Sequence, residues 1–214
     1  MPVLRHKGKA AVRVTARGRS GHSSRPDLGH NAIHALLPAL EAIATEAARQ
    51  RQDGPTNAHF LPPYSTLQIG KISGGEAINI IPETASADIE ARAIAGVDPL
   101  ALLEPALRVV AADEALSAEI IASYPGLALD DDHALARLTA RLSGSLPLAA
   151  VSYGTEAGLY QKAGIPAIVC GPGDIARAHK PDEYITTGEL LGAREMVLRL
   201  GQELRVREGT VAAR

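Results

Sequence analysis

Two histidines stand in loop segments where a side chain could do chemistry. His22 lies in the run Gly21-His22-Ser23-Ser24, and His179 lies in Ala178-His179-Lys180-Pro181, at the end of a long glycine- and proline-rich stretch. A histidine held in such a loop can ligate a metal ion or transfer a proton near neutral pH. Each also has an ordinary interpretation, because His22 could be a solvated turn residue and His179 a structural side chain. The residue types leave both interpretations open.

Asn79 and Arg92 could hold a small polar ligand. Asn79 follows the paired glycines of Gly74-Gly75-Glu76-Ala77-Ile78, which let a ligand approach the backbone, and its amide offers donors and an acceptor. Arg92 is the last polar residue of an alternating segment, and its guanidinium could bind a carboxylate through two parallel hydrogen bonds. The alternatives are a plain hairpin connection capped by Asn79 and a surface ion pair between Arg92 and Asp88 or Glu90.

A third candidate segment is Tyr153-Gly154-Thr155-Glu156-Ala157, between a short apolar segment and the expected start of a helix. Backbone N–H groups at a helix N-terminus attract anions, so Gly154 and Thr155 could contact a substrate. Thr155 could instead be only the residue that caps the helix.

The sequence lacks the patterns that hold a catalytic metal ion. A zinc site takes three or four protein ligands, yet there is no H-x-D, no H-E-x-x-H, no C-x-x-C and no adjacent pair of glutamates. There is also no G-x-S-x-G segment and no phosphate-binding P-loop. The residues therefore indicate scattered parts of a polar site without a catalytic centre.

Composition is that of an ordinary globular protein. Of the 214 residues, 46% are hydrophobic and 21% are charged, and the net charge of −2 gives no basic footprint for nucleic acid or an anionic membrane. The single cysteine, Cys170, excludes an internal disulfide, and no apolar run approaches the ~20 residues of a membrane span. We therefore expect a cytoplasmic protein with no nucleic-acid or membrane partner.

The elements that position these residues fall into two groups. Up to residue 124 the hydrophobic pattern predicts the order β-α-β-β-α-β, a four-stranded antiparallel sheet with two helices on one face. The expected strands are 9–17, 66–72, 84–92 and 118–123, and the expected helices are 33–47, kinked at Pro38, and 99–112. Residues 49–63 are polar and rich in turn formers, which predicts a surface loop.

After residue 124 the pattern changes. Helices at 131–142, 156–163 and 187–204 alternate with short apolar segments at 149–151 and 167–170, which indicates a parallel α/β layer. These strands are too few for a complete layer, so we expect one edge of a larger sheet. The expected fold class is α/β, with domains at residues 5–124 and 125–214.

In order along the chain, the motifs resemble those of the family of acetylornithine deacetylase, succinyl-diaminopimelate desuccinylase and related zinc carboxypeptidases. The carriers are GRSGHSS at residues 18–24, GGEAINIIP at 74–82, YGTEA at 153–157, CGPG at 170–173 and AHKPDEY at 178–184. The resemblance runs from His6-Lys7-Gly8 to about Ile185. It implies a lid, or dimerisation, domain at 5–124 followed by the C-terminal part of a zinc-hydrolase catalytic domain, most similar to the acetylornithine deacetylase branch.

The resemblance assigns roles to the candidate residues. His22 would reach across a two-fold homodimer into the partner's active site, where it would help to stabilise the tetrahedral oxyanion. Asn79 and Arg92 would grip the substrate from the lid, and Gly154 and Thr155 would contact it from the catalytic domain. His179 would be a metal ligand. The substrate would be a small N-acyl amino acid, first N-acetylornithine in arginine biosynthesis, and the cofactor would be zinc or cobalt.

The sequence departs from the family in its metal ligands. The family's N-terminal half supplies an H-x-D segment, a bridging aspartate, a Glu-Glu pair and a further carboxylate, and none has a counterpart here. We therefore expect the chain to be a truncated product of a longer hydrolase, unable to retain the metal and inactive alone, with Met1 an internal methionine or the mark of a split gene. The alternatives are a non-catalytic dimerisation or ligand-binding module, and a hydrolase for succinylated or peptide amides.

Overall fold

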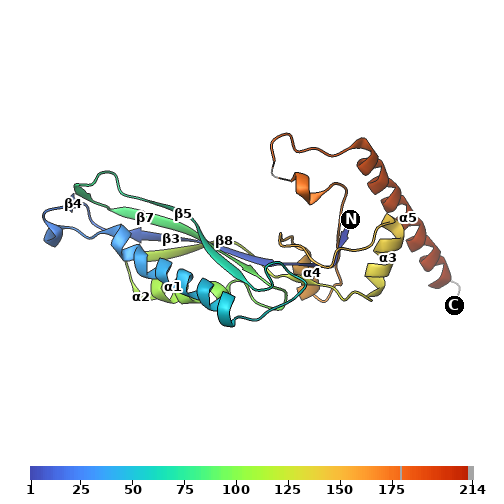
Figure 1. The fold of residues 1–214 in the computed structure, drawn as a ribbon, viewed down its shortest axis with the longest axis horizontal. Coiled ribbons are helices and arrows are strands. Elements are labelled where there is room, and N and C mark those ends of the chain that lie inside the picture. The colour runs from blue at the N-terminus through green and yellow to red at the C-terminus, as the bar shows by residue number, and fades with distance from the viewer. Residues whose placement is uncertain (179, 212–214) are drawn as a thin grey trace.

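The computed structural model describes residues 1–178 and 180–211, with side chains described up to residue 205. Figure 1 shows an elongated molecule, with the sheet and helices α1 and α2 towards one end and helices α3 and α5 towards the other. The chain's N-terminus lies beside the second group, and its first long strand runs into the sheet.

The sheet has the predicted antiparallel topology, with strand order β5-β7-β3-β8. Alternation places small and branched side chains of the two central strands on one face, where Val12, Val14 and Ile89 are fully buried. The opposite face is charged, with ion pairs such as Arg13–Asp88 at 2.7 Å. The strands are β3 (Gly8–Arg17), β5 (Thr66–Gly74), β7 (Thr84–Ala93) and β8 (Leu116–Tyr124).

Helices α1 (Ala32–Asp53) and α2 (Glu104–Ala112) cover the apolar face of the sheet, as predicted. A 3-10 turn, η2 (Ala101–Leu103), leads into α2. Asn31 begins α1 by accepting hydrogen bonds from the backbone N–H groups of Ile33 and His34 through its side-chain oxygen, at 2.9 and 3.1 Å.

The expected surface loop at 49–63 is wrong in its first part, because α1 runs to Asp53. Polar residues extend the helix there. Gln50 is only 2% exposed and donates to the carboxylate of Glu46, which also pairs with Arg49 at 2.7 Å. Contacts between residues three and four apart stabilise this last turn even though it has few apolar side chains.

Six further strands of two residues form three antiparallel pairs: β1 with β10, β2 with β9, and β4 with β6. The pair of β4 and β6 lies at the far end of the sheet. The expected strand at 149–151 is wrong, since Leu148 and Val151 make only isolated parallel bridges to Val3 and His6. Single pairings leave no parallel sheet in the described residues. The strands are β1 (Pro2–Val3), β2 (Arg5–His6), β4 (Gly21–His22), β6 (Ile80–Ile81), β9 (Leu127–Ala128) and β10 (Val169–Cys170).

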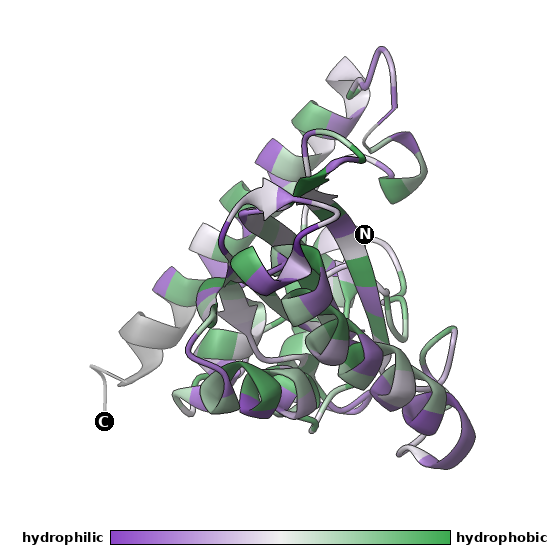
Figure 2. Ribbon diagram, turned by 90° about the vertical axis from the view of Figure 1, so that its left-hand side faces the viewer, coloured by the Kyte–Doolittle hydropathy of each residue, from purple (hydrophilic) through white to green (hydrophobic). Residues whose placement is uncertain are grey.

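Besides η2, the described residues form two further 3-10 turns, η1 (Pro26–Leu28) and η3 (Ile175–Arg177). The C-terminal segments carry the predicted helices α3 (Ala134–Ser143), α4 (Ala157–Lys162) and α5 (Thr187–Val211). Their apolar core is small and centres on Leu4, Leu129 and Ala136. Figure 2 shows hydrophobic and hydrophilic bands alternating along α5, where Leu191 and Val197 are exposed. Among the described helices none is long and apolar enough to cross a membrane.

Candidate functional site

His22 and Asn79 lie together at the end of the sheet farthest from the C-terminal segments. His22 pairs with Ile80 across β4 and β6, and the backbone N–H of Ser23 donates to the carbonyl oxygen of Asn79 at 3.0 Å. The His22 ring is exposed, and its Nδ1 lies 2.8 Å from the hydroxyl of Ser24. We call this region, residues 21–24 and 75–81, the tip.

A hollow of about 860 Å³ lies beside the tip. His30, His34 and Asn31 line it from the start of α1, and Gly75 and Ile80 line it from the opposite loop. The tip and the residues at the start of α1 thus present the exposed imidazoles of His22, His30 and His34 to whatever faces them.

Arg92 lies at the other end of β7, in register with Lys9 and Thr66. Its guanidinium binds the carboxylate of Glu90 at 2.7 Å, which is one of the two ordinary ion pairs that the sequence allowed. Lys9 binds the same carboxylate at 3.1 Å. Burial alone would raise the pKa of Glu90, but the hydrogen bonds from Arg92 and Lys9 outweigh it and lower that pKa. A ligand carboxylate at Arg92 would therefore compete with Glu90.

Gly154 and Thr155 lie at this same end of the sheet, packed against the start of the chain. A Cβ at Gly154 would stand 2.7 Å from the carbonyl oxygen of Lys7 and 2.6 Å from the ring of Tyr124, so only glycine fits there. The hydroxyl of Thr155 lies 3.1 Å from Nε2 of His6 and accepts the backbone N–H of Ala157 at 3.1 Å. Thr155 therefore binds the first backbone N–H of α4 from one residue before the N-cap position, which is Glu156, whose side chain makes no capping hydrogen bond. We call residues 5–9, 92–93, 124–128 and 151–158 the junction.

The junction also buries two titratable side chains that sequence reasoning missed. His6 is 0% exposed and Lys7 only 1%. The ammonium of Lys7 donates to the carbonyl oxygens of Pro62 and Tyr64 at 3.1 and 2.8 Å, and burial lowers its pKa. Burial also lowers the pKa of His6, against smaller opposing effects from the Lys7 carbonyl and Glu156. Charged residues are mostly exposed, so nothing in the local sequence pattern indicates that these two side chains are buried.

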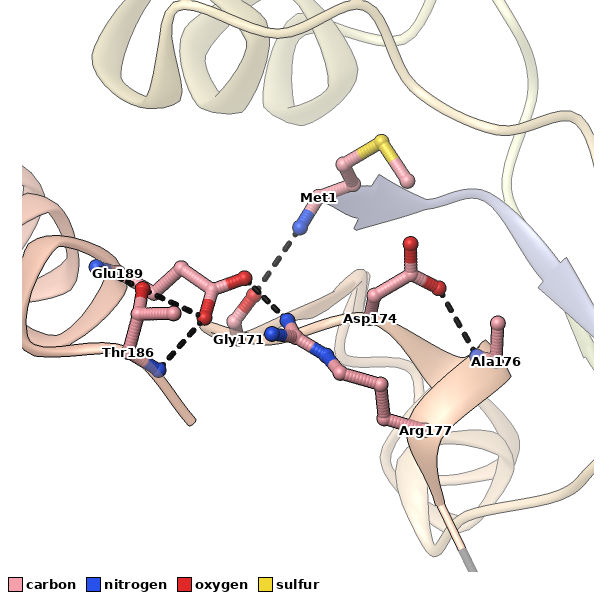
Figure 3. Close-up of polar contacts among 7 residues, drawn as sticks. All are labelled: Met1, Gly171, Asp174, Ala176, Arg177, Thr186 and Glu189. Carbon is pink, nitrogen blue, oxygen red and sulfur yellow. Dashed lines mark hydrogen bonds and ion pairs between the residues drawn. The ribbon is translucent and has the colours of Figure 1, made fainter. Parts of the chain in front are cut away.

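A second polar cluster fixes the loop between β10 and α5. Figure 3 shows the guanidinium of Arg177 directed at the carboxylate of Glu189, with Thr186 bonded to the other oxygen of that carboxylate. Arg177 also lies over the ring of Tyr184, 4.8 Å from its centroid. The ion pair with Arg177 and the backbone N–H of Thr186 lower the pKa of Glu189 to about 2. His179, the predicted metal ligand in this loop, lies outside the described residues.

Thr186 and Glu189 form a capping box at the start of α5. The Thr186 hydroxyl accepts the backbone N–H of Glu189 at 3.2 Å, and the Glu189 carboxylate accepts the backbone N–H of Thr186 at 2.8 Å. The spacing T-x-x-E is visible in the sequence, so this element could have been found there.

The described residues do not fit a zinc site. None of their histidine, cysteine, aspartate and glutamate side chains gather in a group of three or more that could hold a metal ion. A structural or catalytic zinc needs at least three protein ligands.

The predicted site residues therefore form two groups. His22 and Asn79 lie at the tip, and Arg92, Gly154 and Thr155 lie at the junction. The ten residues of β7 separate the two groups by roughly 30 Å at the rise of an extended strand. One copy of the chain cannot bring them to a single small ligand.

Known proteins are similar to this chain in sequence over most of its length. A family model described as the peptidase dimerisation domain of M20 proteins matches residues 4–115. The chain is 35% identical over 208 residues to an acetylornithine deacetylase from Myxococcus xanthus, covering 93% of this chain and 53% of that protein. It is 33% identical over 204 residues to one from Pectobacterium carotovorum subsp. carotovorum, covering 92% and 52%. The chain thus spans about half the length of these curated relatives.

Solved structures share the fold. Aminopeptidase PepT from Bacillus cereus superposes with a TM-score of 0.63 at 22% identity, over 92% of this chain and 52% of that one. The M20 family metallo-carboxypeptidase Sso-CP2 from Sulfolobus solfataricus gives 0.65 at 17% identity, over 92% and 58%. At these identities the likeness concerns the fold.

Proposed function

This chain belongs to the M20 peptidase dimerisation-domain family, and from that premise we propose that it is part of a metal-dependent amide hydrolase that releases the acyl group of an N-acyl amino acid. N-acetylornithine is the substrate we propose first. The observation that carries this is the identity of 33–35% over 92–93% of the chain to proteins named acetylornithine deacetylase. Because the chain spans about half of their length, the activity is proposed for a longer protein that contains these residues.

The proposed division of labour follows the two groups of residues. Arg92, Gly154 and Thr155 contact the substrate from the junction of one copy. His22 and Asn79 reach the same substrate from the tip of a second copy related by a two-fold axis, because roughly 30 Å of β7 separates tip and junction within one copy. His179 and residues of the longer protein that lie outside this chain would hold the zinc or cobalt ion.

An extended reading frame tests the proposal. If genomic DNA upstream of Met1 continues in frame with a Glu-Glu pair and an H-x-D segment, the extended protein is assayed with zinc or cobalt beside the 214-residue chain. We expect the extended protein to deacetylate Nα-acetyl-L-ornithine faster than it cleaves N-succinyl-diaminopimelate or a tripeptide, and the short chain to cleave none. A stop codon followed by unrelated sequence would count against a longer hydrolase, and preference for another substrate would change the branch of the family.

The second candidate is a non-catalytic dimerisation or ligand-binding module. It is favoured by the match of residues 4–115 to a dimerisation domain and by the lack of a three-ligand metal group among the described residues. It predicts a stable folded chain that carries no stoichiometric zinc by elemental analysis after gel filtration. A chain that aggregates on expression, as an exposed strand edge would favour, speaks against this candidate.

A further inference from the structure

His6 makes two hydrogen bonds that together fix where its ring proton lies. Its Nδ1 is 2.9 Å from the carbonyl oxygen of Lys7, which can only accept, so Nδ1 carries the proton. Burial of the ring, 0% exposed, favours the neutral form and lowers the pKa, although Glu156 and the Lys7 carbonyl act in the opposite direction. In a neutral ring protonated at Nδ1, Nε2 has a lone pair and no proton.

The bare Nε2 determines the direction of the hydrogen bond to Thr155. Nε2 and the Thr155 Oγ1 are 3.1 Å apart, so the hydroxyl must donate its single proton to the ring. The same oxygen accepts the backbone N–H of Ala157 at 3.1 Å. A hydroxyl has one proton and two lone pairs, so Thr155 keeps one lone pair and has no proton left to donate.

The close packing of the surrounding backbone holds this arrangement in place. Gly154 lies against the Lys7 carbonyl, and a Cβ at Gly158 would stand only 2.3 Å from the carbonyl oxygen of Pro125. The glycines on both sides of Thr155 thus bring its segment into direct contact with backbone at the junction. Thr155 has little room to move away from His6 and turn its hydroxyl elsewhere.

We propose that His6 is a positioning residue whose Nε2 accepts the hydrogen bond that the Thr155 hydroxyl donates. Thr155 can then bind a ligand only as a hydrogen-bond acceptor. The ligand atom opposite Thr155 is then an N–H or O–H donor, such as an ammonium or an amide N–H, and not a carboxylate oxygen. This assignment of a ligand group rests on the proposed function, in which Thr155 contacts the substrate. The orientation of the hydroxyl itself belongs to this chain alone.

The test reads the histidine ring of the ¹⁵N-labelled 214-residue chain by long-range ¹H–¹⁵N correlation at pH 7, with His6 assigned by the loss of its signals in His6→Gln. We expect a protonated Nδ1 and an unprotonated Nε2 for His6. A ring protonated at Nε2, or at both nitrogens, would overturn the proposal.

Two variants of Thr155 provide the matched comparison. Thr155→Val keeps the shape and removes the hydroxyl, so the ¹⁵N shift of Nε2 should move to that of a nitrogen without a donor. Thr155→Ser restores the hydroxyl and should restore the shift, which a merely structural effect of the side chain's size would not do. An Nε2 shift that is the same in all three proteins contradicts the proposal. Neither readout involves substrate, so failure of the deacetylase assay and failure of this test are separate results.

Discussion

Single buried residues at the junction link protonation to folding. Burial lowers the pKa of His6 in the folded chain below the usual value of 6.5, which applies to the unfolded chain. At a pH between the folded and unfolded pKa, the unfolded chain therefore binds a proton that the folded chain does not. Stability from the neutral ring is therefore fully present above about pH 6.5 and is lost as the pH falls below it towards the folded pKa. Burial also lowers the pKa of Lys7 in the folded chain below its usual value of 10.5. The free energy of unfolding therefore also rises with pH in the alkaline range, as the pH approaches 10.5.

We accordingly expect the free energy of unfolding to fall on acidification below pH 6.5 more steeply in the wild type than in His6→Gln. A single titrating group contributes at most about 1.4 kcal/mol per pH unit to this slope. Urea denaturation between pH 5.0 and 7.5 measures it. Identical slopes in the two proteins would mean that His6 titrates alike in the folded and unfolded chains. His34→Gln, on the exposed side of α1, serves as the matched control.

Gly154 gives a steric prediction. Gly154→Ala forces a methyl group against the Lys7 carbonyl and the Tyr124 ring, and overpacking of this kind costs about 1–3 kcal/mol. Gly171→Ala is the control, since a Cβ there meets no atom within 4 Å. Chemical denaturation compares the two. Equal stabilities would show that the junction opens to accept the methyl group.

Sequence could predict some of these residue environments but not others. The sequence allows the ion pair between Arg92 and Glu90 and a hydrogen bond from Thr155 near the start of α4, because both depend on neighbours two residues away, although the N-cap position itself is Glu156. The burial of His6 and Lys7 was not foreseen. It depends on contacts with Thr155 and Tyr64, which are far away in the sequence.

At the scale of elements, the start of α5 depends on its capping box. Thr186→Ala removes the acceptor for the backbone N–H of Glu189, and the loss of such a cap costs about 1 kcal/mol. Because the helix packs mainly on α3, we expect the loss to appear as faster amide hydrogen exchange in the first turn of α5. Thr187→Ala changes the neighbouring threonine and should leave that exchange almost unchanged. Equal exchange in both variants would rule out the box as the determinant.

The elements also show which patterns are informative. The strands and helices of the sheet layer followed from period-two and helical periodicity over eight or more residues. The extension of α1 to Asp53 did not, because polar contacts between Glu46, Arg49 and Gln50 stabilise it instead of an apolar stripe. Of the two-residue strands, β10 lies within the expected strand at 167–170, but its antiparallel pairing with β1, at the opposite end of the chain, has no signal in the local sequence.

At the scale of the whole molecule, we expect a homodimer. Among the described residues, edge strands β5 and β8 each pair on one side only, and Ile72 and Ile121 on them are 59% and 50% exposed. Light scattering coupled to gel filtration should give twice the 22.3 kDa of one chain. A mass of one chain at all concentrations would contradict the two-copy site. Ile72→Lys and Ile121→Lys, compared at the same concentration, would show which edge carries the contact.

The length of β7 has a genetic consequence. If tip and junction of different copies build each site, a longer enzyme altered at His22 and another altered at Gly154 are defective for different reasons. Mixed in one cell, they form heterodimers in which one of the two sites has an intact tip and an intact junction. Random pairing makes about half of the dimers mixed, so about a quarter of all sites work. Two inactive alleles would thus complement each other, whereas two alleles altered at the same end would not.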